Sequence, residues 1–301
     1  MRIGVAATPD VALPTLEWLL QSEHEIALVI TQPDRPAGRG REMKQSVIGD
    51  WAQKHNIALL KPETSQELLG KIEQLDLVLT IGYGVLLPEE ILRLPKHGFL
   101  NLHFSMLPAY RGAAPVQRAL ENGESTSGVT VFELEKGMDT GPIFSQHMVE
   151  ISPRWRSVEL LEHLAFLGPQ VVQDCFDKII AGQKPTSQVG EPSYAHKISK
   201  AEAKIDFGLD TRTIVNRIRA FTYEPGAWTT WRNEPFKISD AISSSAFAGK
   251  PGEIKIIGTN VLVTTHSSAI ELLRVIPAGK KEMDAIDWAR GARLSGGEHF
   301  G

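Results

Sequence analysis

The chain has 301 residues, of which 42 % are hydrophobic and 23 % charged, and its net charge is −4. This composition is typical of a globular protein, and it excludes a disordered or collagen-like chain. At about 150 residues per domain, the length favours two domains. We expect no membrane span and no signal peptide, because no apolar run reaches roughly 18 residues and the first ten residues lack an apolar core. The single cysteine, Cys175, excludes an internal disulfide framework, fits a reducing cytoplasm and is more typical of a core residue than of a nucleophile.

A negative net charge argues at first against a nucleic-acid partner, which normally requires a basic surface. The charge is unevenly distributed, however. Residues 1–207 hold 20 Lys and Arg against 26 Asp and Glu, whereas residues 208–301 hold 12 against 10. The net charge of the whole chain therefore does not exclude a nucleic-acid partner.

Short apolar runs alternate with helical patterns in the first two thirds of the chain. Alternation of this kind predicts a mainly parallel sheet covered on both faces, with ligands bound beyond the carboxyl ends of the strands. The expected strands are 2–7, 26–31, 57–60, 77–81 and 99–103, and the expected helices are 12–21, 44–55, 65–75 and 88–94.

The pattern changes towards the C-terminus. Two runs at 128–135 and 143–149 predict a hairpin around the loop 136–142, and residues 158–181 form a long amphipathic helical pattern. A polar stretch at about 183–199 predicts a linker between two domains. After it, one helix and several short alternating strands predict a small β-barrel; the helix is 211–221 and the strands are 227–231, 237–241, 252–257, 261–265 and 269–275.

Several common site motifs are missing from the sequence. The first strand runs into Ala-Ala-Thr-Pro-Asp instead of a glycine-rich turn that could cradle a pyrophosphate. There is no Walker A motif, no Cys-x-x-Cys and no His-Glu-x-x-His, and the nine histidines include no pair four residues apart. We therefore expect no metal site.

Polar side chains at the end of one predicted strand suggest chemistry. Alternation along 99–103 places Asn101 and His103 on the same face. An amide beside an imidazole suits stabilising a developing oxyanion and moving a proton, although a purely structural role for the pair is the commoner case. Asp139, in a glycine-flanked loop, reads by itself as a turn residue. A carboxylate near His103 would raise the pKa of the imidazole, fix its tautomer and help to position water.

The segment 33–44 is basic, with Arg35, Arg39, Arg41 and Lys44 interspersed with glycines. An isolated segment of this kind is usually a solvated, mobile loop. Binding of a phosphate backbone, with ordering on contact, is the alternative.

Two runs of residues, at 101–115 and 137–141, resemble the motifs of a known family. The run N-L-H-F-S-M-L-P-A-Y-R-G-A-A-P at 101–115, followed by G-M-D-T-G at 137–141, is similar to the folate-dependent formyltransferases. Asn101, His103 and Asp139 match the catalytic positions of that family. Phe104 and Met106 depart from it where a glycine and a leucine are usual, which bears on the shape of the folate pocket. Three further segments, 31–41, 194–198 together with 203–206, and 277–281, resemble the members that act on initiator methionyl-tRNA.

The resemblance implies a fold, a donor and a partner. The expected fold is α/β, with a Rossmann-like catalytic domain at 1–183, a linker at 184–206 and an OB-like β-barrel that binds tRNA at 207–301. The formyl donor would be 10-formyltetrahydrofolate, the acceptor the amine of initiator methionyl-tRNA, and the enzyme a monomer without metal. Folate would be held, largely through backbone groups, by Tyr83, Gly84, Leu87, Ser105, Met106, Leu107 and Pro108. The tRNA would contact Arg35, Arg39, Arg41, Lys44, Lys204, Lys280 and Lys281, with Arg217 and Arg219 as further candidates.

Two other functions remain open from the sequence. A formyltransferase acting on a small amine, such as a nucleotide sugar or glycinamide ribonucleotide, would share the three catalytic positions but would have no need of the basic segment. A catalytically silent RNA-binding protein would have no need of the three catalytic positions.

Overall fold

The computed structural model describes residues 1–37, 42–245, 249–294 and 297–301. These residues form two compact units, each built from three separate segments of the chain. Unit 1 consists of Met1–Ala113, Thr126–Val149 and Leu161–Ala195, and unit 2 of Ala114–Ser125, Glu150–Leu160 and His196–Gly301.

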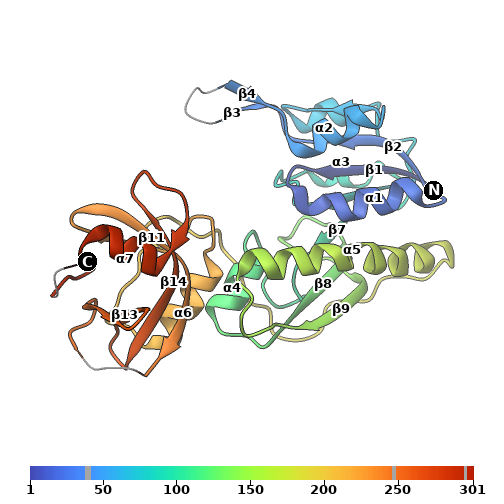
Figure 1. Ribbon diagram of the computed structural model, residues 1–301. Helices are drawn as coiled ribbons and strands as arrows, with labels where there is room; N and C mark the ends of the chain where they lie inside the picture. Colours follow the sequence, from blue (N-terminus) through green and yellow to red (C-terminus); the bar gives the residue numbers. More distant parts are fainter. Residues whose placement is uncertain (38–41, 246–248, 295–296) are drawn as a thin grey trace. The chain divides into compact units, whose positions relative to one another are not determined.

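Unit 1 is organised around a seven-stranded sheet in the order β5-β2-β1-β6-β7-β8-β9 (Figure 1). The first five strands in that order are parallel, and β8 is antiparallel to β7. The expected mainly parallel sheet is therefore confirmed. The strands are β1 (Arg2–Ala7), β2 (Glu25–Ile30), β5 (Leu59–Leu60), β6 (Leu77–Ile81), β7 (Phe99–His103), β8 (Thr126–Glu133) and β9 (Ile143–Glu150).

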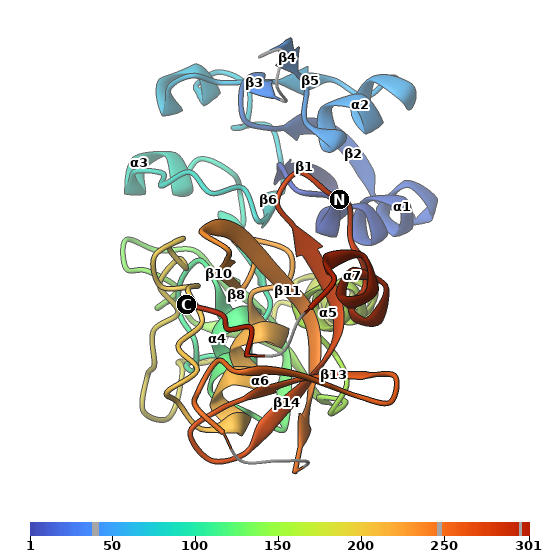
Figure 2. The same ribbon diagram turned by 60° about the vertical axis from the view of Figure 1, so that its left-hand side comes forward.

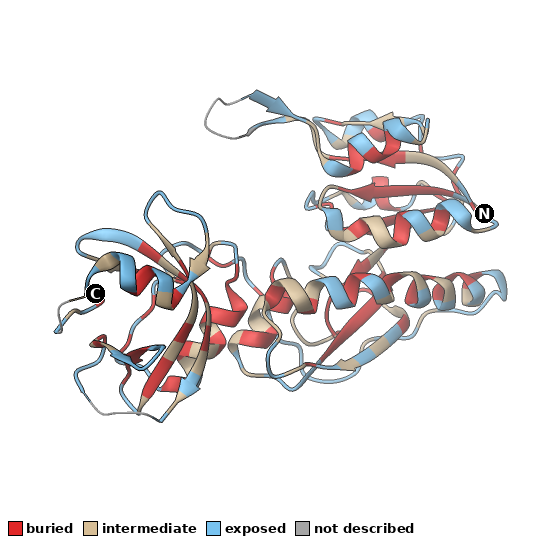
Figure 3. Ribbon diagram, viewed as in Figure 1, coloured by how far each residue is buried: buried red, intermediate tan, exposed pale blue. Residues whose placement is uncertain are grey.

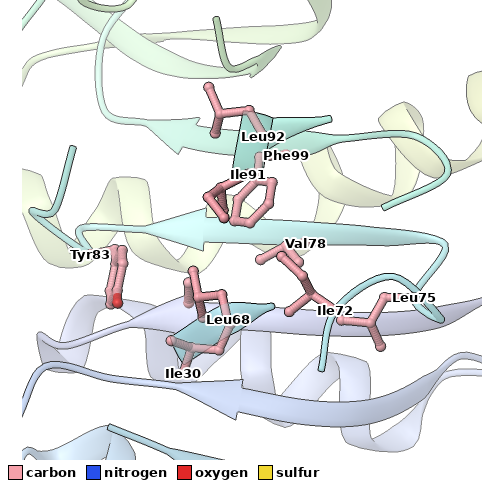
Figure 4. Packing of buried hydrophobic residues seen from close by; sticks show 10 residues of the cluster. Ile30, Leu68, Ile72, Leu75, Val78, Tyr83, Ile91, Leu92 and Phe99 are labelled. Carbon is pink, nitrogen blue, oxygen red and sulfur yellow. The ribbon is translucent and has the colours of Figure 1, made fainter. Parts of the chain in front are cut away.

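Both faces of this sheet are covered. On one face lies α5 (Ser157–Ile180), where Gly168 allows close approach, since a Cβ there would lie 3.0 Å from Leu102 of β7 and 2.7 Å from Thr15 of α1 (Leu13–Gln21). The other face carries an apolar cluster that includes Val78 and Phe99 (Figure 4). Because side chains alternate along a strand, Asn101 and His103 share the face of Phe99. Burial is nearly continuous along β1, as Figure 3 shows.

The remaining elements of unit 1 depart from the sequence prediction in two places. The helix expected at 65–75 is only a 3₁₀ turn, η2 (Ser65–Leu68), because Gly70 adopts a left-handed φ of +74° and turns the chain. The basic segment contains two short paired strands, β3 (Arg35–Ala37) and β4 (Glu42–Lys44), where a loop was expected. The other elements are η1 (Asp10–Ala12), α2 (Val47–Lys54) and α3 (Glu89–Leu92), the last shorter than predicted.

Unit 2 is built on an antiparallel sheet in the order β10-β11-β14-β13-β12, with β15 paired to β14 (Figure 2). All five strands and the helix expected beyond the linker are present, so a β-rich C-terminal domain is confirmed, and its sheet is antiparallel. Two short helices, α4 and α7, were not predicted. The elements are α4 (Pro115–Glu121), α6 (Thr211–Ala220), β10 (Trp228–Trp231), β11 (Glu234–Ser244), β12 (Ile254–Ile257), β13 (Asn260–Thr264), β14 (Ala269–Pro277), β15 (Met283–Asp284) and α7 (Ala285–Ala292).

The expectation that Cys175 is a core residue is confirmed. Cys175 is fully buried in α5, and burial raises the pKa of its thiol, so it is a core residue. Within the part of the chain that the structure describes, no helix is both long and apolar enough to cross a membrane.

Candidate active site

Asn101 lies in β7, and its side-chain amide is held in one orientation. The neighbouring strand β6 pairs Thr80 with Asn101, and the Thr80 hydroxyl shares its hydrogen between Asn101 Oδ1, at 2.8 Å, and the Leu100 carbonyl oxygen, at 3.0 Å. Thr80 is itself buried. Because this bond engages the oxygen of the amide, the Nδ2 group keeps its two hydrogens for a ligand. Asn101 is thus preset as a hydrogen-bond donor.

His103 is the last residue of β7 and is buried, with an exposed fraction of 6 %. Its Nε2 lies 3.0 Å from the carbonyl oxygen of Tyr110, so the hydrogen belongs on Nε2 and Nδ1 is left as a proton acceptor. Tyr110 adopts a left-handed φ of 62°, which is uncommon outside glycine and asparagine. The backbone is therefore bent unfavourably where it fixes the tautomer of this histidine.

Asp139 reaches His103 from the loop between β8 and β9. Its Oδ2 lies 3.9 Å from His103 Nδ1 and accepts a 2.7 Å hydrogen bond from the backbone N–H of Gly112. The φ of Asp139 is 51°, again left-handed. Gly141, two residues on, passes so close to the Glu133 carbonyl that no side chain fits there. The structure thus brings together the carboxylate and the imidazole that the sequence predicted to pair.

The Asp139 carboxylate raises the pKa of His103, as expected, but the net shift is downward. Burial lowers the pKa of the imidazole, and this effect outweighs the nearby Asp139 carboxylate and the Tyr110 hydrogen bond, which both raise it. His103 is therefore neutral at pH 7. The site offers an amide donor and a neutral imidazole whose protonated form would face a carboxylate.

A pH dependence of stability follows. Burial also lowers the pKa values of His24 and His97, so in all three histidines the unfolded state binds protons at a higher pH than the folded state. Their contribution to stability is complete above the ordinary value of about 6.5 and is lost as the pH falls through the lowered values. We expect the Tm to fall below pH 6.5 and to fall less steeply in a His103→Gln variant, measured by calorimetry; parallel curves for the two proteins would contradict this origin.

The turn after β7, residues 105–108, is fixed from within the protein. The Ser105 hydroxyl donates to the Ala109 carbonyl at 2.6 Å, and Thr130 Oγ1 donates to the Ser105 carbonyl and accepts from the Leu107 N–H. Gln146 donates to the Leu107 carbonyl, and the Leu107–Pro108 peptide bond is cis. These hydrogen bonds fix the turn in one conformation. The Ser105 and Leu107 carbonyl oxygens each have a second lone pair with which they could accept from a ligand.

The two departures from the family pattern, Phe104 and Met106, lie next to this turn and within it. Phe104 is buried, with an exposed fraction of 8 %, so it does not turn outward. Met106 packs over Gly128 of β8, where a Cβ would collide with its sulfur.

A cavity of about 390 Å³ lies beyond β2 and β6. Tyr83, Val85 and Leu87 form its apolar lining, and Gly84, with a left-handed φ of 72°, turns the chain between them. The Tyr83 side chain also belongs to the apolar cluster of Figure 4. Residues 105–108 are not part of the lining, so the structure places the expected folate residues in two groups. The other lining residues are Gln32, Pro33, Asp34, Arg35, Pro62, Glu63, Thr64 and Ser65.

Of the basic segment, Arg35 and Lys44 are exposed and face one another as partners in the pairing of β3 with β4. The base of this two-stranded ribbon is anchored by an ion pair of 2.6 Å between Asp34 and Lys61. Arg39 and Arg41 lie outside the described residues.

In unit 2 the predicted lysines are exposed. Lys204 lies 5.8 Å from the ring of Trp228, and Lys280 and Lys281 follow β14. Lys280 also borders a cavity of about 590 Å³ that Trp231, Phe236 and Trp288 line.

The two arginines named as further candidates are engaged inside unit 2. Arg219 is 9 % exposed and donates to the carbonyls of Pro153 and Trp155, so its expected contact with phosphate is wrong. Arg217 forms a 2.8 Å ion pair with Glu121.

Sequence reasoning missed Thr80, Thr130 and Gln146, whose partners are distant in sequence. A threonine inside the apolar run 77–81 was the available signal for the first of them. Among the described residues, no group of three or more His, Cys, Asp and Glu side chains is arranged to hold a metal ion.

Comparison with known proteins agrees with this site. The formyl transferase family model matches residues 1–175, and the model of the formyl transferase C-terminal domain matches 197–293. A protein from Salinispora tropica named methionyl-tRNA formyltransferase is 41 % identical over 99 % of both chains.

Two solved structures share the fold at low identity. One is an N-formyltransferase from Helicobacter canadensis in complex with folinic acid and dTDP-3-aminofucose, at 21 % identity and a TM-score of 0.68 over 90 % of this chain and 98 % of that one. The other is a methionyl-tRNA formyltransferase from Clostridium thermocellum, at 16 % identity and a TM-score of 0.58 over 82 % and 95 %. The fold is thus shared by formyltransferases with different names. The chain belongs to the formyl transferase family, and it is 41 % identical over nearly its full length to a relative named methionyl-tRNA formyltransferase.

Proposed function

We propose that this protein transfers the formyl group of 10-formyltetrahydrofolate to the free amine of initiator methionyl-tRNA. The observation that carries the proposal is the 41 % identity, over 99 % of both chains, with a protein of that name. The grouping of Asn101, His103 and Asp139 supports it, because these residues match the catalytic positions of the family and stand within one unit.

The residues that line the cavity have the chemical character that a folate ligand requires. An apolar cavity edge at Tyr83 and Leu87 suits a flat ring, and Gln32, Asp34 and Arg35 add polar groups beside it. The turn 105–108, which does not line this cavity, is the second group proposed to contact folate, and its own hydrogen bonds already hold it in place before binding. When bound, the folate supplies the formyl carbon that the amine attacks.

Asn101 stabilises the charge that develops on the formyl oxygen. As the amine attacks, that oxygen becomes negative, and the Nδ2 hydrogens donate to it more strongly than to the neutral carbonyl. The bond from Thr80 fixes the amide beforehand, so no reorganisation is needed during the reaction.

His103 takes the proton that the attacking amine must lose, and it can return that proton to N10 of the folate when collapse of the tetrahedral adduct breaks the bond between N10 and the formyl carbon. The imidazole is neutral, and its Nδ1 is the free acceptor because Nε2 is bound to Tyr110. Protonation at Nδ1 places a positive charge beside Asp139 Oδ2, which then stabilises the imidazolium. The same positive charge also favours the oxyanion. Because Nε2 is engaged by the Tyr110 carbonyl, His103 acts on that oxygen through its charge and not through a hydrogen bond.

Positive side chains on both units would hold the tRNA. Arg35 and Lys44 extend from the β3–β4 ribbon, and Lys204, Lys280 and Lys281 are exposed on unit 2. Contacts of this kind bind phosphates without reading sequence. We propose that Arg39 and Arg41 contact the tRNA as well, on the basis of the sequence resemblance alone. We also propose that the enzyme is a monomer and that it works in the cytoplasm, where translation is initiated.

A formylation assay tests the function. Purified protein is incubated with 10-formyltetrahydrofolate and either initiator or elongator methionyl-tRNA, and formylmethionyl-tRNA is measured. We expect transfer to the initiator species. In a parallel reaction, a dTDP-linked amino sugar replaces the tRNA, because the Helicobacter canadensis structure holds such a ligand. Transfer to the sugar without transfer to tRNA would replace this function by the small-amine alternative.

A further inference from the structure

Gln188, in the polar stretch read from sequence as a linker, lies against the candidate active site. Its Nε2 donates to the carbonyl oxygens of Asp139 and Gly141, both at 2.8 Å. Its Oε1 accepts from Arg111, at 3.2 Å from Nε and 2.7 Å from Nη2. One amide therefore joins the loop that carries Asp139 to the loop that follows the turn 105–108.

Both of these loops act on His103. Asp139 faces Nδ1 of the imidazole, and Tyr110, next to Arg111, binds Nε2 through its carbonyl. Asp139 and Tyr110 also hold left-handed backbone conformations, which other contacts must maintain. A residue that binds both loops thus controls the relative placement of the two groups that define the state of His103.

The rest of the stretch around Gln188 secures it to unit 1. On one side, Thr186 exchanges backbone hydrogen bonds with Ile143 of β9 at 2.7 and 2.9 Å. On the other, Ser193 accepts from the N–H of Tyr110 through its hydroxyl and from the N–H of Arg111 through its carbonyl, each at 2.8 Å. Gln188 is therefore held from both sides against the loops that it joins.

We propose that Gln188 is a positioning residue for formyl transfer: it keeps the Asp139 carboxylate and the Tyr110 carbonyl in register around His103. The inference rests on the proposed function. The Nε2 group of its amide holds the loop that carries Asp139, and the Oε1 atom holds the side chain of Arg111. Misplacement of a reacting group by about 1 Å can cost on the order of 10²-fold in rate, so its loss lowers kcat more than it weakens binding.

Three variants test the proposal by steady-state kinetics. Gln188→Met keeps the length of the side chain and removes all of its hydrogen bonds, and we expect kcat to fall by about 10- to 100-fold with little change in either KM. Gln188→Glu keeps the acceptor for Arg111 but loses the donor to the two carbonyls, so we expect it to be impaired as well. The matched control is Gln173→Met in α5, whose amide bonds to Asp177, and its kcat stays at the wild-type value.

A double-mutant cycle separates positioning from general destabilisation. If Gln188 acts through Asp139, then Gln188→Met added to Asp139→Asn lowers kcat little beyond Asp139→Asn alone. Fully additive losses, or a wild-type kcat in Gln188→Met, would overturn the proposal. Retained activity in Gln188→Glu would overturn its donor half.

Hydrogen exchange gives a readout that does not depend on the reaction. The Gly112 N–H is bonded to the Asp139 carboxylate, and we expect it to exchange several-fold faster in Gln188→Met than in the wild type or in Gln173→Met. An unchanged rate would overturn the inference even if the formylation assay succeeds. Faster exchange in a protein that transfers no formyl group to tRNA would instead leave the positioning role standing and remove the proposed function.

Discussion

Asp139→Asn is expected to lower kcat for formyl transfer by about 10²- to 10⁴-fold, the usual contribution of a positioned acid–base system. Asparagine can still accept the hydrogen bond from the Gly112 N–H, and it tolerates the left-handed φ of 51°. The substitution therefore removes the negative charge that faces His103 Nδ1 and leaves the loop in place. Without that charge, the protonated imidazole loses its stabilising partner.

Steady-state kinetics with saturating 10-formyltetrahydrofolate and initiator methionyl-tRNA measures this effect. The KM for each substrate is expected to change little, since the carboxylate acts on the proton transfer. Asp174→Asn, an exposed position on α5, is the control and should match the wild type. A near-normal kcat in Asp139→Asn would remove Asp139 and the proton route through His103 from the mechanism.

Asn101→Ala is expected to lower kcat by about 10²- to 10³-fold, or about 2.7 to 4 kcal/mol, as for loss of one oxyanion donor. The amide makes its strongest bond only when the formyl oxygen carries charge, so the loss falls on the transition state. Its oxygen is already held by Thr80, and the change therefore removes a preset donor rather than a mobile one.

Single-turnover measurements with preformed complexes report this step directly, and calorimetry on the same sample checks that the variant is folded. Asn260→Ala in β13 serves as the matched control and should leave the rate unchanged. If Asn101→Ala raises the KM for folate with kcat intact, Asn101 is a binding residue and the charge must be stabilised elsewhere.

Most elements of the fold were predictable because hydrophobic periodicity reports burial directly. The β-branched and apolar runs of β1, β6 and β7 are buried, and 158–181 differs from α5 by one residue at each end. The failures have local causes. Gly70 stops the helix expected at 65–75. The pairing of β3 with β4 places Arg35 opposite Lys44, nine residues further along the chain, and the basic composition of this segment does not reveal such a pairing.

Some features of the candidate site could likewise be predicted from the sequence, and others could not. Asn101 and His103 could be paired from the sequence because one strand carries both, two residues apart. Asp139 could be joined to them only by the family resemblance, since 36 residues separate it from His103. The direction of the His103 pKa shift needed the structure, because burial of the imidazole outweighs the effect of the carboxylate.

The sequence by itself determined the kinds of chemistry available here: an amide, an imidazole and a carboxylate in family order, a basic segment at 33–44, and a more basic C-terminal part behind a net charge of −4. Only the tertiary structure decided how these groups are held. Thr80 orients Asn101, Tyr110 sets the tautomer of His103, and Gln188 joins the loops around them. Each of these is a hydrogen bond between side-chain or backbone atoms of different segments, and such contacts leave no periodic trace in a single sequence.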